Sequence, residues 1–445
     1  MKTQDLTPHP SPHPQAVRGD PASASPLDNT PRWADELSRQ RLPGPFMQHP
    51  DLRGLAPATL AVHAGTRDDP VTGAVGTPIY QTSTFLLEDN QYQAIEEGYA
   101  RDRFIYTRYG NPSQWAVEQK LAALEGAESA LVFSSGMAAI SATVLSLIDK
   151  GGHIVASNEL YGGTYAFFQG ELPSLGMSVS YVNPRDLAAI EAAIRPNTQI
   201  LFFESLTNPL LKVADIPALV AMGKRHGVRV VIDATFTSPI AMQPLALGVD
   251  VVVHSASKYL NGHSDLIAGV ACGSRKLLDS IWPRRLAYGG SLDPHACFML
   301  ERGLKTLAIR MRAHAEGALA VARWLESAKH VRRVYFAGLP SHPDHQLAQR
   351  LLKNPTGMIC FELDGSDAHA VRLLDALRLG KKATSLGGVE TLVSLPFNTS
   401  HAAFTGAQRE RMGIQPGCVR LSVGIEDPAD LIADLQQAIK VAFAD

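Results

Sequence analysis

Short apolar runs alternate with longer amphipathic segments from about residue 115 to residue 272, and this alternation limits the possible folds most strongly. The runs are ALVF (130–133), HIVA (153–156), VSYV (179–182), ILFF (200–203), VRVVI (228–232), VDVVVH (249–254) and AGVAC (268–272). Such runs are typical of buried strands, and helices between them favour parallel pairing. The pattern therefore predicts an α/β fold with a mainly parallel sheet covered by helices on both faces.

Two helices carry recognisable boundary signals. The segment QWAVEQKLAALEG (114–126) places its apolar residues on one helical face and ends at Gly126, a residue that commonly terminates helices. Near the C-terminus, Asp427 is a predicted N-cap, Pro428 is the first helical residue and Asp430 adds an acid to the first turn.

Composition and pattern divide the chain into four regions. Residues 1–50 hold ten of the 29 prolines and are predicted to form a disordered tail, because they cannot bury enough apolar surface to fold. Residues 51–110 are expected to form an N-terminal extension and residues 111–300 the large sheet domain. Residues 301–445 are expected to contain a linking helix and a smaller α+β domain.

The charge balance excludes several classes of partner. Lys and Arg number 41 and Asp and Glu number 43, so electrostatics offer no reason to expect a nucleic acid or an anionic membrane. The four cysteines are far apart and form no CxxC pair, which is typical of free thiols in a reducing compartment. No apolar run is long enough to span a bilayer. The expected compartment is the cytoplasm.

The carboxyl ends of the predicted strands are where ligands of such sheets bind, and two of them carry a notable pair. Asp233 ends VRVVID, and Lys258 follows VVVH. Taken singly, a capping aspartate and a solvent-exposed lysine explain them equally well. Together they match pyridoxal phosphate (PLP), which needs a lysine to form an imine and a carboxylate beside its ring nitrogen.

Phosphate-binding groups are expected next to this pair. Ser255 and Ser257 flank the lysine, and their hydroxyls suit a phosphate oxygen. In SSGMAAI (134–140), a strand turns through Gly136 and Met137 into a helix, whose first N–H groups attract anions. Strand–glycine–helix turns are also common for packing reasons, so this motif alone is a weak signal.

Other strand ends and loops add candidates. Tyr161 follows HIVA and could stack on a flat ring and carry a proton. The stretch FESLTNP puts Glu204 and Asn208 past ILFF, where an amide could reach the phenolic oxygen of the cofactor. Arg108, beside Tyr106, could bind phosphate through paired hydrogen bonds, although an exposed polar loop explains that stretch equally well.

Together these segments resemble the Cys/Met-metabolism family of PLP enzymes, which includes cystathionine γ-synthases, cystathionine γ-lyases and methionine γ-lyases. The resemblance runs from about Ala61 to the C-terminus. It rests on YTRYGNPS, SSGMAA, LYGGTY, FESLTNPL, IDATF, HSASKYLNGHSD, SLGGVETL and VRLSVGIED, in that order. It implies an aspartate-aminotransferase-like fold with a seven-stranded sheet, and a homotetramer built from two catalytic dimers.

The resemblance also implies a role for each matching residue. Lys258 is the imine lysine and the general base, Asp233 the partner of the ring nitrogen, and Tyr161 the stacking and proton-transferring tyrosine. The cofactor phosphate is bound by Gly136, Met137, Ser255 and Ser257 of the same subunit and by Tyr106 and Arg108 of the neighbouring one, through the N-terminal extension. Ser385 and Arg420 hold the substrate carboxylate, with Tyr106 nearby.

The implied reaction takes place at the γ-carbon of a sulfur amino acid or an acylhomoserine. It is a γ-elimination or γ-replacement like that of cystathionine γ-lyase or γ-synthase; a methionine γ-lyase or an O-acylhomoserine sulfhydrylase is the alternative. A PLP-binding protein without turnover is a more remote one. A metal site at His254, His263 and Asp265 is disfavoured, because these residues lack compact ligand spacing.

The chain departs from the family pattern at four positions. Ala234 replaces a frequent Asn and Leu206 a frequent Pro, and both changes are expected to be tolerated. Gly163 stands where methionine γ-lyases usually carry Cys, which argues against strict methionine specialisation. Thr384 stands where cystathionine γ-synthases and γ-lyases often carry a Glu that meets the distal amino group of cystathionine.

Overall fold

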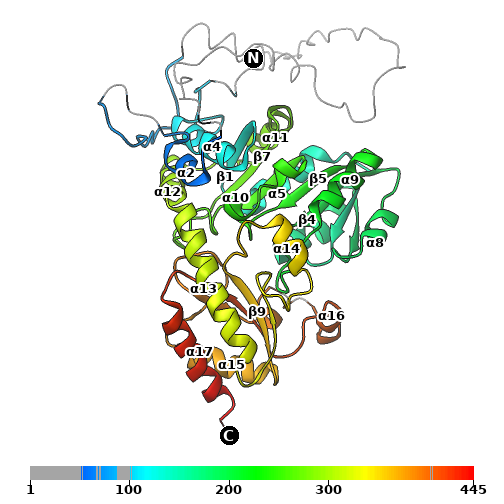
Figure 1. Cartoon of the computed structure of the whole chain (residues 1–445). Helices are drawn as coiled ribbons and strands as arrows, with labels where there is room; N and C mark the ends of the chain where they lie inside the picture. The colour runs from blue at the N-terminus through cyan, green and yellow to red at the C-terminus, as the bar shows by residue number, and fades with distance from the viewer. Residues whose placement is uncertain are drawn as a thin grey trace, which may run out of the picture.

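The computed structural model describes residues 52, 54–66, 69, 72–87, 101, 103–400, 402 and 404–444. The predicted tail, residues 1–50, lies outside this range, as does part of the predicted N-terminal extension. Figure 1 shows a large unit built around one sheet, a smaller C-terminal unit around a second sheet, and the long helix α13 (Leu307–Ser327) running between them. The α/β class predicted from the alternating pattern is confirmed.

The large sheet has seven strands in the order β1-β7-β6-β5-β4-β2-β3. They are β1 (Ser129–Phe133), β2 (His153–Ser157), β3 (Ser178–Val182), β4 (Thr198–Glu204), β5 (Arg229–Asp233), β6 (Val251–Ser255) and β7 (Gly269–Gly273). Each predicted apolar run forms one of them. β2 to β6 pair in parallel, whereas β7 is antiparallel to both β6 and β1. The loop 256–268 contains no helix, so β7 returns beside β6 in the opposite direction.

Helices cover both faces of this sheet. They include α2 (Pro57–His63), α4 (Pro112–Glu125), α5 (Gly136–Leu147), α6 (Gly162–Ala166), α8 (Leu187–Ala192), α9 (Ile216–His226), α10 (Ser238–Ala241), α11 (Arg275–Ala287) and α12 (Pro294–Leu304). Along β1, Ala130 and Val132 join the core under α4 and α12, while Leu131 and Phe133 join the core under α5 and α11. Two buried faces explain why the strands read as continuous apolar runs.

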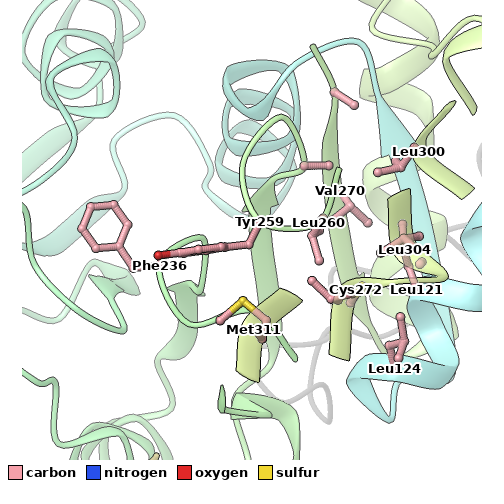
Figure 2. Packing of buried hydrophobic residues seen from close by; sticks show 14 of the residues in the cluster. Leu121, Leu124, Phe236, Tyr259, Leu260, Val270, Cys272, Leu300, Leu304 and Met311 are labelled. Carbon is pink, nitrogen blue, oxygen red and sulfur yellow. The ribbon is translucent and has the colours of Figure 1, made fainter. Parts of the chain in front are cut away.

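Figure 2 shows the core under α4 and α12. Leu121 and Leu124 of α4 meet Leu300 and Leu304 of α12 beside Val270 of β7, and all are buried. The helix predicted from the 114–126 pattern is confirmed, although it begins earlier, at Pro112, and ends at Gly126 in the left-handed conformation. This packing holds β7, and with it the loop that precedes β7, in place.

The small sheet has the order β10-β11-β12-β9-β8. Its strands are β8 (Val331–Tyr335), β9 (Met358–Leu363), β10 (Lys381–Lys382), β11 (Leu392–Ser394) and β12 (Cys418–Ser422), with helices α14 (His345–Leu351), α15 (Asp367–Ala376), α16 (Gly406–Arg411) and α17 (Pro428–Ala442). The predicted start of α17 is confirmed, because the Asp427 carboxylate accepts a hydrogen bond from Ala429 N at 2.8 Å.

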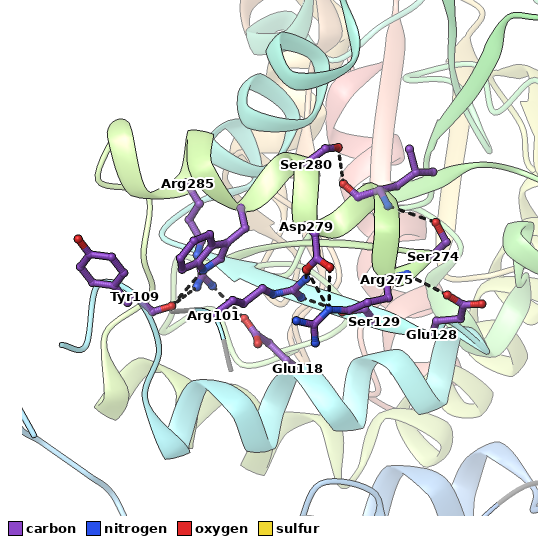
Figure 3. Close-up of polar contacts among 12 residues, drawn as sticks. Arg101, Tyr109, Glu118, Glu128, Ser129, Ser274, Arg275, Asp279, Ser280 and Arg285 are labelled. Carbon is purple, nitrogen blue, oxygen red and sulfur yellow. Dashed lines mark hydrogen bonds and ion pairs between the residues drawn. The ribbon is translucent and has the colours of Figure 1, made fainter. Parts of the chain in front are cut away.

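A buried polar cluster, shown in Figure 3, ties the 101–111 segment to the large unit. Arg285 is fully buried and donates to the Glu118 carboxylate at 2.9 Å and to the Tyr109 carbonyl at 3.0 Å. Trp282 also donates to the Tyr109 carbonyl, at 3.1 Å. These contacts anchor the Tyr109 backbone, and with it the stretch that carries the candidate Tyr106 and Arg108, because a buried N–H donor is costly without an acceptor.

All four cysteines are buried and unbridged, as the sequence predicted. Two of them, Cys360 and Cys418, lie on neighbouring strands with their Sγ atoms 3.2 Å apart. Within the described part of the chain, no helix is both long and apolar enough to cross a membrane.

Candidate active site

Lys258 lies in the loop that follows β6, at the carboxyl edge of the large sheet. Its Nζ donates to Ser385 Oγ at 2.6 Å. Arg310 holds this loop in place, because its guanidinium donates to the carbonyls of Tyr259 at 2.7 Å and Leu260 at 3.3 Å. Burial, with a smaller contribution from the Arg420 charge, lowers the pKa of Lys258 to about 8. The amine is therefore much closer to its neutral, nucleophilic form than an exposed lysine.

Asp233 is the last residue of β5 and is nearly buried. Its Oδ1 accepts hydrogen bonds from Thr235 N at 2.9 Å and Thr235 Oγ1 at 2.5 Å, while among the described residues nothing donates to Oδ2. Ser255 N in turn donates to Thr235 Oγ1 at 2.8 Å, which links the ends of β5 and β6. Burial raises the pKa of Asp233. A cationic ring N–H would relieve that penalty.

Two segments of the predicted phosphate site, Gly136 at the start of α5 and Ser255, lie close together. A Cβ atom added to Gly136 would lie 2.8 Å from Ser255 Cβ, so only glycine lets the two segments approach this closely. Ser135 caps the helix by accepting from Ala138 N at 3.0 Å. The first N–H groups of α5 and the Ser255 hydroxyl thus lie together, and both suit a phosphate dianion.

Ser257 is placed differently from the expectation. Its hydroxyl accepts from Ala268 N at 2.9 Å and donates to Ala268 O at 3.3 Å. It would bind a phosphate oxygen only by giving up the longer of these two bonds. In this structure it holds the two ends of the lysine loop together.

Tyr161 directly precedes α6 as its N-cap residue and is 52% exposed. Its backbone N–H donates to Glu204 Oε1 at 2.6 Å. Glu204 ends β4 directly beside Asp233, and burial together with the Asp233 charge raises the pKa of Glu204 well above its usual value. The sequence pattern indicated only that Glu204 lies past a strand; its contact with Tyr161 depends on the fold.

Gly163 leaves room for the Tyr161 ring. A Cβ atom at this position would lie 2.6 Å from Tyr161 Cε1 and 3.2 Å from Met137 Sδ. Any side chain here would push the ring of Tyr161 to another position. The absence of a side chain at Gly163 therefore permits the position that the Tyr161 ring has in this structure.

Arg420 lies on β12 and is buried. It donates to the Ser385 carbonyl at 3.0 Å and to Asn208 Oδ1 at 3.2 Å. Ser385, whose φ is +79°, adopts a left-handed backbone that is uncommon for serine and is often found at functional sites. Lys258, Ser385, Arg420 and Asn208, predicted separately from distant motifs, form one hydrogen-bonded chain.

Gly387 explains how the SLGG motif reaches the lysine. Its φ is +76°, and an added Cβ would lie 2.6 Å from Tyr259 N. Glycine is therefore required twice, for the backbone conformation and for the close approach. The result is that Ser385 of the small unit lies against the lysine loop of the large one.

Tyr106 and Arg108 are the predicted site residues that a single chain does not bring to this place. Tyr106 is 43% exposed. The Arg108 Cζ atom lies 5.9 Å from the ring centroid of Tyr106 and 5.0 Å from that of Tyr109. Within the described residues, neither side chain bonds to Lys258 or Asp233.

Among the described residues, no group of three His, Cys, Asp or Glu side chains could hold a metal ion. His254 instead bonds the buried Glu125 at 2.6 Å, and His263 bonds the carbonyl of Asn261 at 2.7 Å. Both histidines therefore have structural partners.

Two replacements of Glu204 test whether its side chain acts by holding the Tyr161 backbone or by carrying a negative charge. Glu204→Gln keeps an acceptor for Tyr161 N–H, and it puts a neutral amide in place of a carboxyl whose pKa is raised by burial, so the variant is expected to retain kcat within a few-fold. Glu204→Ala leaves that N–H unpaired, and one lost buried hydrogen bond, about 1–3 kcal/mol, predicts a kcat roughly tenfold lower or worse. Steady-state assays of both variants check this. Equal damage in the two variants would contradict the positioning role.

A lysine of lowered pKa, a buried carboxylate, a helix-end anion cradle and a buried guanidinium meet at the carboxyl edge of an α/β sheet. These are the groups that PLP and an α-amino acid require. The fold and the site thus define a PLP-dependent enzyme.

Comparison with known proteins gives the family. The sequence model described as Cys/Met metabolism PLP-dependent enzyme matches residues 58–440, and the chain belongs to this family. It is 40% identical to the L-methionine gamma-lyase of Pseudomonas putida over 387 residues, 86% of this chain and 97% of that protein. It is 41% identical to the cystathionine beta-lyase of Coxiella burnetii over 384 residues, 86% and 97% of the two chains.

A plant relative and a solved structure are similar to this chain over most of its length. Cystathionine gamma-synthase 1 of Arabidopsis thaliana is 40% identical over 385 residues, 86% of this chain and 68% of that protein. The structure of cystathionine gamma-lyase from Lactobacillus plantarum, complexed with L-serine, superposes with a TM-score of 0.82 at 38% identity, covering 88% of this chain and all of that one. The cofactor is therefore PLP, and the chain is a transsulfuration-type lyase or replacement enzyme.

Proposed function

We propose that this enzyme acts at the γ-carbon of a sulfur amino acid or an acylhomoserine, by γ-elimination or γ-replacement. The observation that supports the proposal is the hydrogen-bonded chain from Lys258 through Ser385 to Arg420, which joins an amine of lowered pKa to a guanidinium that is suited to a carboxylate. This arrangement suits an α-amino acid held by its carboxylate with its α-carbon near the lysine. The relatives named as γ-lyases and γ-synthase support γ-carbon chemistry.

Each residue has a proposed task. Bound PLP supplies an electron sink for the substrate carbon atoms. Asp233 holds the ring nitrogen, and Gly136, Met137, Ser255 and Ser257 face the phosphate. Arg420, with Ser385, grips the substrate carboxylate through paired hydrogen bonds. Lys258 removes the α-proton as a general base, and the hydroxyl of Tyr161 serves proton transfer at the leaving group. Asn208 supports both Arg420 and the phenolic side of the cofactor.

The candidate substrates are cystathionine, methionine, homocysteine and an acylhomoserine. Cystathionine γ-lyase-like or γ-synthase-like activity is the leading candidate, and methionine γ-lyase or O-acylhomoserine sulfhydrylase activity is the alternative. Gly163, which accommodates the tyrosine ring, separates the site from the usual methionine γ-lyase pattern. Thr384 provides no carboxylate for a distal amino group. Both residues act on specificity and leave the shared chemistry unchanged.

The complete site is proposed to need two chains. Tyr106 and Arg108 are exposed on a segment fixed by the buried Arg285, so a neighbouring subunit can reach them. We propose a tetramer of two catalytic dimers, in which these two side chains complete the partner's phosphate site. The four unbridged thiols support a cytoplasmic location.

A substrate panel tests the proposed reaction. The purified enzyme is incubated with cystathionine, methionine, homocysteine and an acylhomoserine, each with and without cysteine. Elimination yields 2-oxobutanoate and ammonia whether or not cysteine is present, whereas replacement consumes cysteine and lowers the 2-oxobutanoate yield. Absence of turnover with every γ-substituted substrate would contradict the proposal and favour a binding protein.

The lowered pKa of Lys258 predicts how cofactor uptake depends on pH. Below pH 8 the amine is mainly protonated, so about a tenth is reactive at pH 7 and most is reactive at pH 9. The rate of PLP uptake by the apoenzyme should rise several-fold across this interval, as followed by the absorbance of bound PLP. Pyridoxine phosphate, which has no aldehyde, is the control and should show no such rise. A rate that increases only near pH 10 would contradict the lowered pKa.

A further inference from the structure

A groove of about 560 Å³ lies between the outer edges of the two sheets. β3 is the last strand of the large sheet and β8 the last strand of the small one. Arg185 follows β3, Arg332 and Arg333 lie on β8, and Arg411 ends α16. The groove therefore has walls from both units and contains none of the candidate PLP or substrate residues.

Positive charge dominates the lining of this edge groove. Five cationic side chains line it, namely Arg185, Lys212, Arg332, Arg333 and Arg411. Three of them already have carboxylate partners. Arg185 pairs with Asp344 at 2.6 Å, Lys212 with the buried Glu159, and Arg332 with Glu362 at 3.3 Å.

The other two guanidiniums, Arg333 and Arg411, have no carboxylate partner among the described residues. Arg333 lies over the ring of Tyr335, at 4.8 Å from its centroid, and Arg411 Nε donates to the Ala407 carbonyl at 3.3 Å. Both are exposed, and most of their N–H donors remain available. Glu410 is also in the lining and reduces the net charge by one, so an excess of positive charge remains.

The shape and chemistry of the groove indicate its ligand. Its volume falls in the usual range for organic ligands and is larger than a single inorganic ion needs. Guanidinium groups bind phosphate through paired, charge-assisted hydrogen bonds, and two of them on separate elements, β8 and α16, suit a chain of phosphates. Leu210 and Met412 add an apolar surface for an organic portion. We propose that the edge groove binds a phosphate-bearing organic anion of nucleotide size.

The experiment uses the full-length holoenzyme, in which PLP already fills its own phosphate site. Isothermal titration calorimetry at low ionic strength is run with ATP and, separately, with inorganic tripolyphosphate. We expect one ligand per chain. The double variant Arg333→Ser/Arg411→Ser should bind at least about tenfold more weakly, since hydrogen bonds to charged groups are lost. Tighter binding of ATP than of tripolyphosphate would support the proposal, because the organic part then contacts the groove; equal binding would overturn the organic ligand.

Two further variants make the result specific. Gln415→Glu adds a negative charge to the lining and should also weaken binding, whereas Arg225→Ser, on the exposed surface of α9, should not. Melting temperature and PLP absorbance should be unchanged in all of them. Absence of binding to the holoenzyme, or equal binding by the double variant, would overturn the proposal.

Discussion

Replacing Lys258 with alanine is expected to abolish turnover, with kcat lower by at least about 10³-fold. The variant loses the amine that is proposed to anchor PLP and to act as the general base, and proton transfer alone contributes about 10²–10⁴-fold in enzymes. The phosphate cradle at Gly136 and Ser255 remains, so the variant should still bind PLP, reversibly and more weakly. Steady-state kinetics and dialysis followed by absorbance measure the two effects.

A matched control is Lys440→Ala, an exposed lysine on α17 far from the site. It should leave kcat and PLP retention unchanged. Activity of the Lys258 variant within tenfold of the native enzyme would show that another group is the base.

Replacing Arg420 is the second large effect, and it should fall mainly on substrate binding. Arg420→Lys keeps the charge but loses the fork that pairs with a carboxylate. Two charge-assisted hydrogen bonds at about 1.5–3 kcal/mol each predict a kcat/KM lower by about 10²–10⁴-fold, mostly through KM. PLP absorbance should be unchanged, which distinguishes this variant from one of the cofactor site.

Two further variants test the assignment of Arg420. Arg323→Lys on the exposed face of α13 is the control and should be silent. Arg420→Ala should raise the pKa of Lys258, because the Arg420 charge helps to lower it, and should therefore move the rise in PLP uptake to higher pH. An unchanged KM would exclude Arg420 from carboxylate binding.

The large sheet could be predicted from the sequence because its strands are buried on both faces. Ala130 to Phe133 contribute alternately to two cores, so polar residues are excluded from the whole run. The antiparallel direction of β7 could not be predicted from AGVAC, since an apolar run carries no direction. It results from the helix-free loop 256–268.

The candidate site was partly predictable for a similar reason. Asp233 and Lys258 each follow a strand, and carboxyl ends of parallel strands meet at one edge. The roles of Thr235 and Glu204 depend on individual hydrogen bonds between neighbouring strand ends, which no spacing rule reports. The contact of Ser385 with Lys258 joins residues far apart in the chain through the close approach of Gly387 to Tyr259.

Two expectations depend on molecules other than this single chain. Tyr106 and Arg108 are exposed here, and their proposed partner site belongs to another subunit. Ser257 bonds the backbone of Ala268, so its proposed phosphate contact requires its hydroxyl to turn when the cofactor binds.

The most direct test of the account is to identify the residue that carries PLP. The holoenzyme is treated with borohydride, which makes a lysine–PLP linkage permanent, then digested and mapped by mass spectrometry. We predict the phosphopyridoxyl group on Lys258, in the peptide that contains HSASKYLNGHSD. Finding it on another lysine, or on none, would contradict the assignment of this site.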